Sequence, residues 1–224
     1  MSEIRVDLTF MPSNTKTVFD KLATYHFISK YTLVGGTALS LQIRHRFSED
    51  LDFIFDGQKL NTISIKRDIA TIFPDYRIIR QELDWQIDFL ISTVKVTFFS
   101  TGAIALPFNV IDHSFSYKKI HICKAKTIAS LKMAAIAQRN TIRDYYDLYM
   151  LVKHHFPLID IIGQTKKLIP NLSPITYTET LIYTSDIEET SLENHLMPSE
   201  VITKDHIAEF FIREIRKIKE EIDK

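Results

Sequence analysis

The sequence predicts an α/β (α+β) fold, in which a small mixed sheet with flanking helices is followed by a helical C-terminal domain. Two patterns carry this prediction. Short β-prone runs alternate with helical stretches up to residue 99, and from Lys124 onward apolar residues recur at helical spacing. We therefore expect a core domain over residues 1–120 and a helical domain over residues 121–224.

The core domain is expected to alternate strands and helices around one conspicuous turn. Two of the five glycines are adjacent, at Gly35-Gly36, and they separate a β-prone run from a helical stretch. A later segment, Asp50 to Phe55, alternates polar and apolar residues and then turns apolar, which indicates a strand that enters a core. In chain order we expect a helix over 13–30, a strand over 31–34, a helix over 37–46, a strand over 50–55, a helix over 59–72, and strands over 76–79, 85–91 and 94–99, the last two forming a hairpin.

The helical domain is expected to consist of two helices, a loop-rich stretch and a final helix. Apolar residues at helical spacing mark the first helix around residues 128–136 and the second around residues 145–152. Residues 157–200 contain four of the seven prolines and an acidic stretch, so we expect loops and short helices there. From His206 to Lys224 one apolar stripe predicts a helix that packs on its own domain.

Composition excludes several classes of protein. Hydrophobic residues make up 45% and charged residues 25% of the 224 residues, which is typical of folded chains and not of disordered or collagen-like ones. Lys+Arg and Asp+Glu both number 28, so no overall positive field attracts nucleic acid, and any such binding must be local. The single cysteine, Cys123, excludes an intrachain disulfide and a multi-cysteine zinc site, and we expect it to be buried.

Two further patterns set the expected location. The N-terminal residues MSEIRVDLTF lack the apolar core of a signal peptide. The apolar runs of the sequence do not approach the roughly 20 residues that span a bilayer. We therefore expect a cytoplasmic protein that does not cross a membrane.

Asp50 and Asp52 are the first candidates for chemistry. In a strand, side chains two residues apart point to the same side, with Cα atoms about 6 to 7 Å apart. Two carboxylates at that separation suit Mg²⁺ (or Mn²⁺), a hard cation that takes oxygen ligands and keeps waters for substrate phosphates. The alternative is an exposed strand edge that carries two unrelated acids.

The diglycine turn is the second candidate. Gly35-Gly36-Thr37 stands at the start of a helix, where unpaired N–H groups and the positive end of the helix dipole favour a phosphate. The alternative is a tight turn with Thr37 as N-cap. The order strand, diglycine, helix and Asp-x-Asp strand places a triphosphate site beside a metal site, and the sequence contains no P-loop, dinucleotide-binding glycine motif or HExxH helix.

Two long segments carry a resemblance to a known family. GGTALSLQIRHRFSEDLDF, residues 35–53, and SLKMAAIAQRNTIRDYYDLYML, residues 130–151, resemble the two signatures of the AbiEii/AbiGii toxin family. This family is part of the nucleotidyltransferase superfamily that also contains the polymerase-β-like enzymes. The shorter segments VKVTFF and TLIYTSDIEE are similar to stretches of one branch of the family. The resemblance implies a nucleotidyltransferase core followed by a helical domain that completes the active-site cleft.

The resemblance also implies an activity and a set of residues. A nucleoside monophosphate would pass from a nucleoside triphosphate (NTP) to an acceptor, with a metal ion on Asp50 and Asp52. The implied catalytic residues are Asp50, Asp52, Lys132, Asp144 and Asp147. The implied nucleotide-binding residues are Gly35, Gly36, Thr37, Arg46, Ser48 and Arg139.

Several of these residues also fit ordinary structural roles. Thr141 to Asp144 is a capping pattern at a helix start, and Asp144 and Asp147 share a helix face that could be the exposed one. Lys132 and Arg139 are seven residues apart, which is typical of a phosphate-facing strip and equally of an exposed face.

One position departs from the superfamily pattern. Many nucleotidyltransferases place a third carboxylate on a later strand, and here that position is Thr97. Asp88 on the neighbouring strand, Asp144 or Asp147 could replace it, or a group of the substrate could supply the missing function; otherwise the enzyme is weakened.

We expect the toxin of a toxin–antitoxin pair that modifies RNA, such as tRNA, or protein, with a separate antitoxin as partner. A neutral chain would need a local basic cleft for RNA, for which the sequence offers Arg44, Arg46, Lys132, Arg139 and Arg143. The main alternative is a catalytically weak or inactive module that senses NTP, which Thr97 favours. A purely structural protein without NTP affinity is a third possibility.

Overall fold

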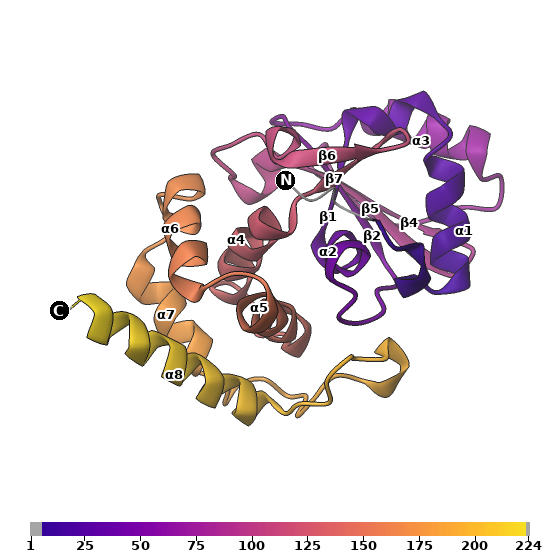
Figure 1. Cartoon of the computed structure of the whole chain (residues 1–224). Coiled ribbons are helices and arrows are strands. Elements are labelled where there is room, and N and C mark those ends of the chain that lie inside the picture. Colours follow the sequence, from indigo (N-terminus) through magenta and orange to yellow (C-terminus); the bar gives the residue numbers. More distant parts are fainter. Residues whose placement is uncertain (1–5, 223–224) are drawn as a thin grey trace. The chain divides into compact units, whose positions relative to one another are not determined.

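The computed structural model describes residues 6–222, so the first five residues of the chain and the last two of the expected final helix lie outside it. The chain divides into two compact units, one up to Lys124 and one from Ala125 onward. The first unit contains the sheet and the second is helical (Figure 1).

A seven-stranded mixed sheet forms the first unit, in the order β3-β4-β5-β2-β1-β7-β6. β1 pairs antiparallel with β2 and parallel with β7, and β2 pairs parallel with β5. The hairpins β3–β4, β4–β5 and β6–β7 complete it. The strands are β1 (Thr32–Val34), β2 (Leu51–Phe55), β3 (Arg77–Glu82), β4 (Gln86–Ile91), β5 (Val94–Ser100), β6 (Ser114–Tyr117) and β7 (Ile120–Cys123).

One face of this sheet is apolar and the other is mixed. Phe53 of β2 lies opposite Phe98 of β5, and Phe89 of β4 projects from the same face of the sheet. All three side chains are buried. Phe19 of α1 (Ser13–Leu22) stacks on Tyr117 of β6 with ring centroids 5.9 Å apart. Figure 1 shows α1 and α3 (Thr62–Ile72) together on one side of the sheet.

Four expectations about elements in this unit need correction. The helix expected over 13–30 ends at Leu22, and a 3₁₀ turn, η2 (His26–Lys30), follows. Helix α2 (Gly35–Ile43) begins at the first glycine and not at Thr37. Its N-cap is Val34, not Thr37, so the interpretation of Thr37 as N-cap is wrong. Strands β6 and β7 were not predicted, because these four-residue strands lack a long apolar run and one of them pairs with the distant β1.

The second unit consists of packed helices. It contains α4 (Ala125–Ile136), α5 (Ile142–His154), α6 (Leu158–Leu168), α7 (Pro174–Ile182) and α8 (Lys204–Ile222). Of the predicted apolar stripe of α8, Ile207 and Phe211 are buried, whereas Ile215 and Ile218 are partly exposed. The remaining 3₁₀ turns of the chain are η1 (Leu8–Phe10), η3 (Thr101–Ile104), η4 (Ile111–His113) and η5 (Asn194–Leu196).

The predicted α/β class with a mixed sheet and a helical C-terminal region is therefore confirmed. In the part of the chain that the structure describes, none of the helices has the combined length and hydropathy of a membrane span.

Candidate active site

The diglycine turn holds the carboxylate of Asp52. β1 ends at Val34, which lies opposite Asp52 of β2, and Gly35 then opens α2 with φ +73°. A Cβ atom added to Gly35 would lie 3.1 Å from Asp52 Oδ2. Both the positive φ and this close approach require glycine. The Asp52 carboxylate therefore lies at the N-terminus of α2, where the helix dipole stabilises negative charge.

The second glycine and the residue after it connect α2 to the segment before β2. A Cβ atom on Gly36 would overlap the Arg46 guanidinium and would lie 3.0 Å from Ser48 Oγ. Thr37 Oγ1 lies 2.8 Å from Ser48 Oγ and also hydrogen-bonds the carbonyl of Asp50. Arg46 donates a 2.9 Å hydrogen bond to the carbonyl of Phe47. These buried contacts fix the backbone that carries Asp50 beside the turn.

The two predicted metal-binding acids differ in position. Asp52 is the second residue of β2, whereas Asp50 directly precedes this strand. Both side chains are partly exposed, so solvent or a ligand can reach them.

A row of side chains continues across the sheet from Asp52. Asp52 lies opposite Thr97 on β5, and Thr97 lies opposite Asp88 on β4. Directly opposed residues project from the same face of a sheet, so all three share one face. Thr97 thus occupies the position beside Asp52, and among the described residues its buried hydroxyl has no hydrogen-bond partner.

Asp88 is buried and partnered on this face. Gln86 Nε2 donates a 2.8 Å hydrogen bond to Asp88 Oδ1, and Lys95 Nζ lies 3.5 Å from Asp88 Oδ2. Lys95 was not among the predicted site residues. Its position two residues before Thr97 on the same strand was the signal that could have identified it.

The second unit contains a buried ionic cluster. Lys132 Nζ of α4 lies 2.6 Å from Asp144 Oδ1 and 2.6 Å from Asp147 Oδ2, both on α5. The side chains of Lys132, Asp144 and Asp147 are 8%, 2% and 0% exposed. The interpretation of the two acids as an exposed helix face is therefore wrong, because their ion pairs with Lys132 turn that face inward.

Arg139 joins this cluster from outside α4. The helix ends at Ile136, so Lys132 and Arg139 do not share a helix face as their spacing suggested. Arg139 Nε nevertheless lies 2.8 Å from Asp144 Oδ2. Burial raises the pKa of Asp144, but the charges and hydrogen bonds of Lys132 and Arg139 outweigh burial and hold this pKa below its ordinary value.

Thr141 does not form the predicted capping box. It is the N-cap residue of α5, but its hydroxyl donates a 2.7 Å hydrogen bond to Asp144 Oδ2 and does not cap the backbone. Asp144 is also in the first turn of α5, where a negative charge is favoured.

Two other arginines considered for a basic cleft are paired with acids within their own units. Arg44 Nε lies 2.9 Å from Asp7 Oδ2, and Arg143 Nη2 lies 3.5 Å from Glu193 Oε2.

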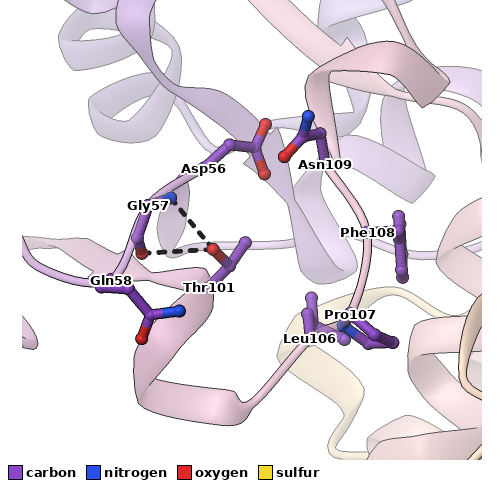
Figure 2. A pocket seen from close by; sticks show the side chains of 8 residues that line it. All are labelled: Asp56, Gly57, Gln58, Thr101, Leu106, Pro107, Phe108 and Asn109. Atoms are coloured by element: carbon purple, nitrogen blue, oxygen red, sulfur yellow. Dashed lines mark hydrogen bonds between the residues drawn. The ribbon is translucent and has the colours of Figure 1, made fainter.

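A separate pocket of about 360 Å³ lies at the other end of β2. Figure 2 shows its lining, in which Asp56 directly follows the strand and Thr101 follows β5. The Asp56 carboxylate accepts hydrogen bonds of 2.7 and 2.8 Å from the backbone of Val110 and Ile111, so it anchors the loop that walls the pocket. Asp52 and Asp56 are four residues apart on one extended segment, about 13 Å by strand geometry, so this pocket is distinct from the diglycine turn.

The diglycine site suits a divalent metal ion by its donors, although residues 6–222 contain no group of three or more His, Cys, Asp or Glu side chains arranged to hold one. Asp50 and Asp52 offer partly exposed carboxylates. A side chain at Gly35 would fill the space against Asp52 Oδ2. Hard cations take carboxylate oxygens and complete their shell with water and phosphate.

A diglycine turn at a helix start, set against an aspartate of the neighbouring strand in a mixed sheet, defines the class as a nucleotidyltransferase. Residues 17–169 match the family model described as "Nucleotidyl transferase AbiEii toxin, Type IV TA system". The chain belongs to this AbiEii nucleotidyltransferase toxin family, as the two sequence signatures indicated.

The chain is also similar to individual proteins, one in sequence and two in fold. The uncharacterized protein aq_aa25 of Aquifex aeolicus (strain VF5) is 30% identical over 204 residues, which cover 90% of this chain and 94% of that protein. A candidate nucleotidyltransferase from H. pylori has the same fold, with a TM-score of 0.58, 18% identity, and coverage of 94% of this chain and 95% of that one. MenT4, a nucleotidyltransferase toxin of Mycobacterium tuberculosis, has a TM-score of 0.54 and 12% identity, covering 92% of this chain and 86% of its own.

Proposed function

We propose that this nucleotidyltransferase transfers a nucleoside monophosphate from NTP to an RNA acceptor, such as tRNA, in a reaction that requires Mg²⁺ or Mn²⁺. A single observation carries this proposal. The Asp52 carboxylate lies against Gly35 at the N-terminus of α2, so a metal-binding acid and a phosphate-binding helix start share one point.

The residues of the turn have separate roles in this proposal. The first-turn N–H groups of α2 bind phosphate oxygens, because Val34 has no polar side chain to cap them. Asp50 and Asp52 hold the metal ion, which neutralises charge on the triphosphate when bound. Thr37, Ser48 and Arg46 keep the backbone in place through their buried contacts.

In the transfer step, an acceptor hydroxyl oxygen bonds to the α-phosphorus of the NTP. The bond from this phosphorus to the β-phosphate bridging oxygen breaks, and pyrophosphate leaves with that electron pair. The hydroxyl proton passes to solvent or to a nearby carboxylate.

The proposal extends to the second unit and to the biological role. By family resemblance, Lys132 of the helical unit acts toward the triphosphate. The family description and the MenT4 name both refer to toxins. They support a toxin that is neutralised by a separate antitoxin protein. That this toxin is cytoplasmic is part of the proposal and rests on the sequence alone.

The test is to incubate the protein with each α-³²P-labelled NTP and with total cellular RNA and protein, with Mg²⁺, Mn²⁺ or EDTA. We expect RNA to be labelled only when the metal ion is present. In Asp52→Asn the amount of label transferred to RNA should fall by at least about 100-fold. Asp112→Asn, an exposed acid in η4, is the matched control and should keep full activity. If protein is labelled and RNA is not, the acceptor is a protein and the proposed RNA acceptor is wrong. If no mixture contains labelled product, the proposed transferase activity is contradicted.

An NTP sensor is the second candidate, and Thr97 is the observation that favours it. With a threonine opposite Asp52, the acceptor-side base of many nucleotidyltransferases is missing at this position. A sensor would show a thermal shift with one NTP and Mg²⁺ but no pyrophosphate release with any acceptor.

A further inference from the structure

A β-bulge in the edge strand β3 places Arg77 and Arg80 on the same face of the sheet. Arg77 lies opposite Leu90 and Arg80 lies opposite Asp88, with a register shift between Ile78 and Arg80. Residues three apart in a regular strand point to opposite faces, and the extra residue of a bulge reverses this. Both arginines therefore project from the face that carries Asp88.

This face is continuous with the diglycine site. Because neighbouring strands are about 4.8 Å apart, Arg80 lies about 15 Å from Asp52 along one row of the sheet. This row consists of Asp52, Thr97, Asp88 and Arg80 on β2, β5, β4 and β3.

Lys95 is a third cation on this face, and a buried acid holds it there. Lys95 Nζ lies 3.5 Å from Asp88 Oδ2, and the Lys95 side chain is 42% exposed whereas that of Asp88 is 2% exposed. Lys95 and Arg77 both lie opposite Leu90, so they form a second row beside the first.

On this face of β3, β4 and β5, more positively charged than negatively charged side chains are exposed to solvent. Arg80 is 53% exposed and hydrogen-bonds Glu82, which is the exposed acid of the three strands on this face. Arg77 is also exposed, and Asp88 is buried. We call Arg77, Arg80 and Lys95 the basic face. The partly exposed Phe99, opposite Gln86 on the same face, adds an aromatic ring.

We propose that the basic face binds the phosphate backbone of a single-stranded nucleic acid acceptor and leads its end toward Asp52. Cations along an extended surface, with an aromatic ring among them, are the features that bind single strands without sequence preference. By strand geometry the three cations lie within about 16 Å of Asp52, a span of a few nucleotides. The term acceptor rests on the proposed function, whereas the binding itself needs no turnover.

The test measures binding of a fluorescein-labelled 20-nucleotide single-stranded RNA by fluorescence anisotropy, without NTP and in the Asp52→Asn background. We expect Arg77→Glu combined with Arg80→Glu to raise Kd by at least about tenfold and to lower the slope of log K against log salt by about 1 to 2. Lys16→Glu is the matched control. It reverses an exposed charge on α1, which packs on the opposite face, and should change Kd by less than about twofold.

Lys95 needs a variant that does not leave Asp88 unpaired. Lys95→Gln combined with Asp88→Asn removes both charges and should also raise Kd, by at least about threefold, with an unchanged far-UV circular dichroism spectrum.

The inference would be overturned if wild type and Arg77→Glu/Arg80→Glu bind the RNA with equal Kd. It would also be overturned if Lys16→Glu weakens RNA binding as much as the double substitution does. Absence of RNA binding in an enzyme that labels protein is a third outcome that would overturn it. These outcomes are independent of the transferase proposal, because anisotropy uses a variant without turnover. RNA binding through the basic face by a protein that labels no acceptor would leave this inference standing and remove the proposed function.

Discussion

Lys132 Nζ lies 2.6 Å from an oxygen of Asp144 and 2.6 Å from an oxygen of Asp147, inside the helical unit. One ammonium group thus pairs with two buried carboxylates, and Arg139 supplies the second positive charge, on Asp144. A buried charge is costly unless it is paired and hydrogen-bonded, so each member of this cluster depends on the others. The cluster fixes α4 to α5 whether or not it also contacts substrate.

Replacement of Lys132 should therefore destabilise the helical unit strongly. Lys132→Met removes the ammonium that two buried carboxylates share, and we expect a loss of about 3 to 5 kcal/mol in the free energy of unfolding by urea. Lys217→Met removes an exposed pair with Glu214 and should cost less than about 0.5 kcal/mol. A loss below about 1 kcal/mol in Lys132→Met would contradict the structural role of the cluster.

The same cluster predicts how stability depends on pH. The folded pKa of Asp144 is below its ordinary value of 3.8, so the unfolded chain binds more protons at acidic pH. The stabilising contribution of Asp144 is complete above pH 3.8 and is lost as the pH falls through the lower, folded pKa. Urea midpoints measured from pH 5 to pH 2 should fall less steeply in Asp144→Asn than in wild type, and parallel curves would contradict this assignment.

Gly35 of the diglycine turn and Gly163 of α6 should respond in opposite ways to substitution by alanine. Gly35→Ala places a Cβ atom 3.1 Å from Asp52 Oδ2 at φ +73°, so it should lose about 1 to 2 kcal/mol of stability and most transferase activity. Gly163→Ala lies inside α6 with no atom within 4 Å of the added carbon, so it should gain about 0.5 to 1 kcal/mol. Thermal unfolding and label transfer measure both. An active Gly35→Ala would show that the close approach to Asp52 is dispensable.

Much of the fold and of the turn could be predicted because their signals are local. A diglycine between a β-prone run and a helical stretch specifies its turn by backbone freedom alone, and Gly35 does open α2. The strand with Asp52 follows from its own alternation. In contrast, Ser114–Tyr117 has a mixed burial pattern, and its strand is defined by pairing with β7 rather than by its own residues.

The remaining features depend on contacts that sequence patterns do not specify. The alignment of Asp88 with Asp52 depends on the register of three strands, and the common face of Arg77 and Arg80 depends on one bulge. The charges of Asp144 and Asp147 left an exposed helix face open as an alternative to a catalytic role, but the ammonium of Lys132 pairs with both and allows their burial.

Glu200 joins the segment that precedes α8 to several residues of α5. Glu200 accepts hydrogen bonds of 2.6 Å from Lys153, 2.7 Å from His154 and 3.1 Å from Tyr149. Its backbone N–H also donates a 3.1 Å hydrogen bond to the hydroxyl of Tyr146. Burial raises the pKa of Glu200, but the hydrogen bonds from Lys153, His154 and Tyr149 outweigh burial and keep this pKa below its ordinary value.

Glu200→Ala should therefore loosen this segment without unfolding the unit. Three partly exposed, charge-assisted contacts are lost together, about 1 to 2 kcal/mol in total, which corresponds to about tenfold faster amide hydrogen exchange over residues 184–203. Exchange in α4 should stay unchanged, because its contacts with α5 do not involve Glu200. Glu189→Ala, an exposed acid of the same stretch, is the control and should exchange like wild type. Equal exchange in the two variants would show that the backbone bond to Tyr146 and the buried Leu192 and Leu196 hold the segment by themselves.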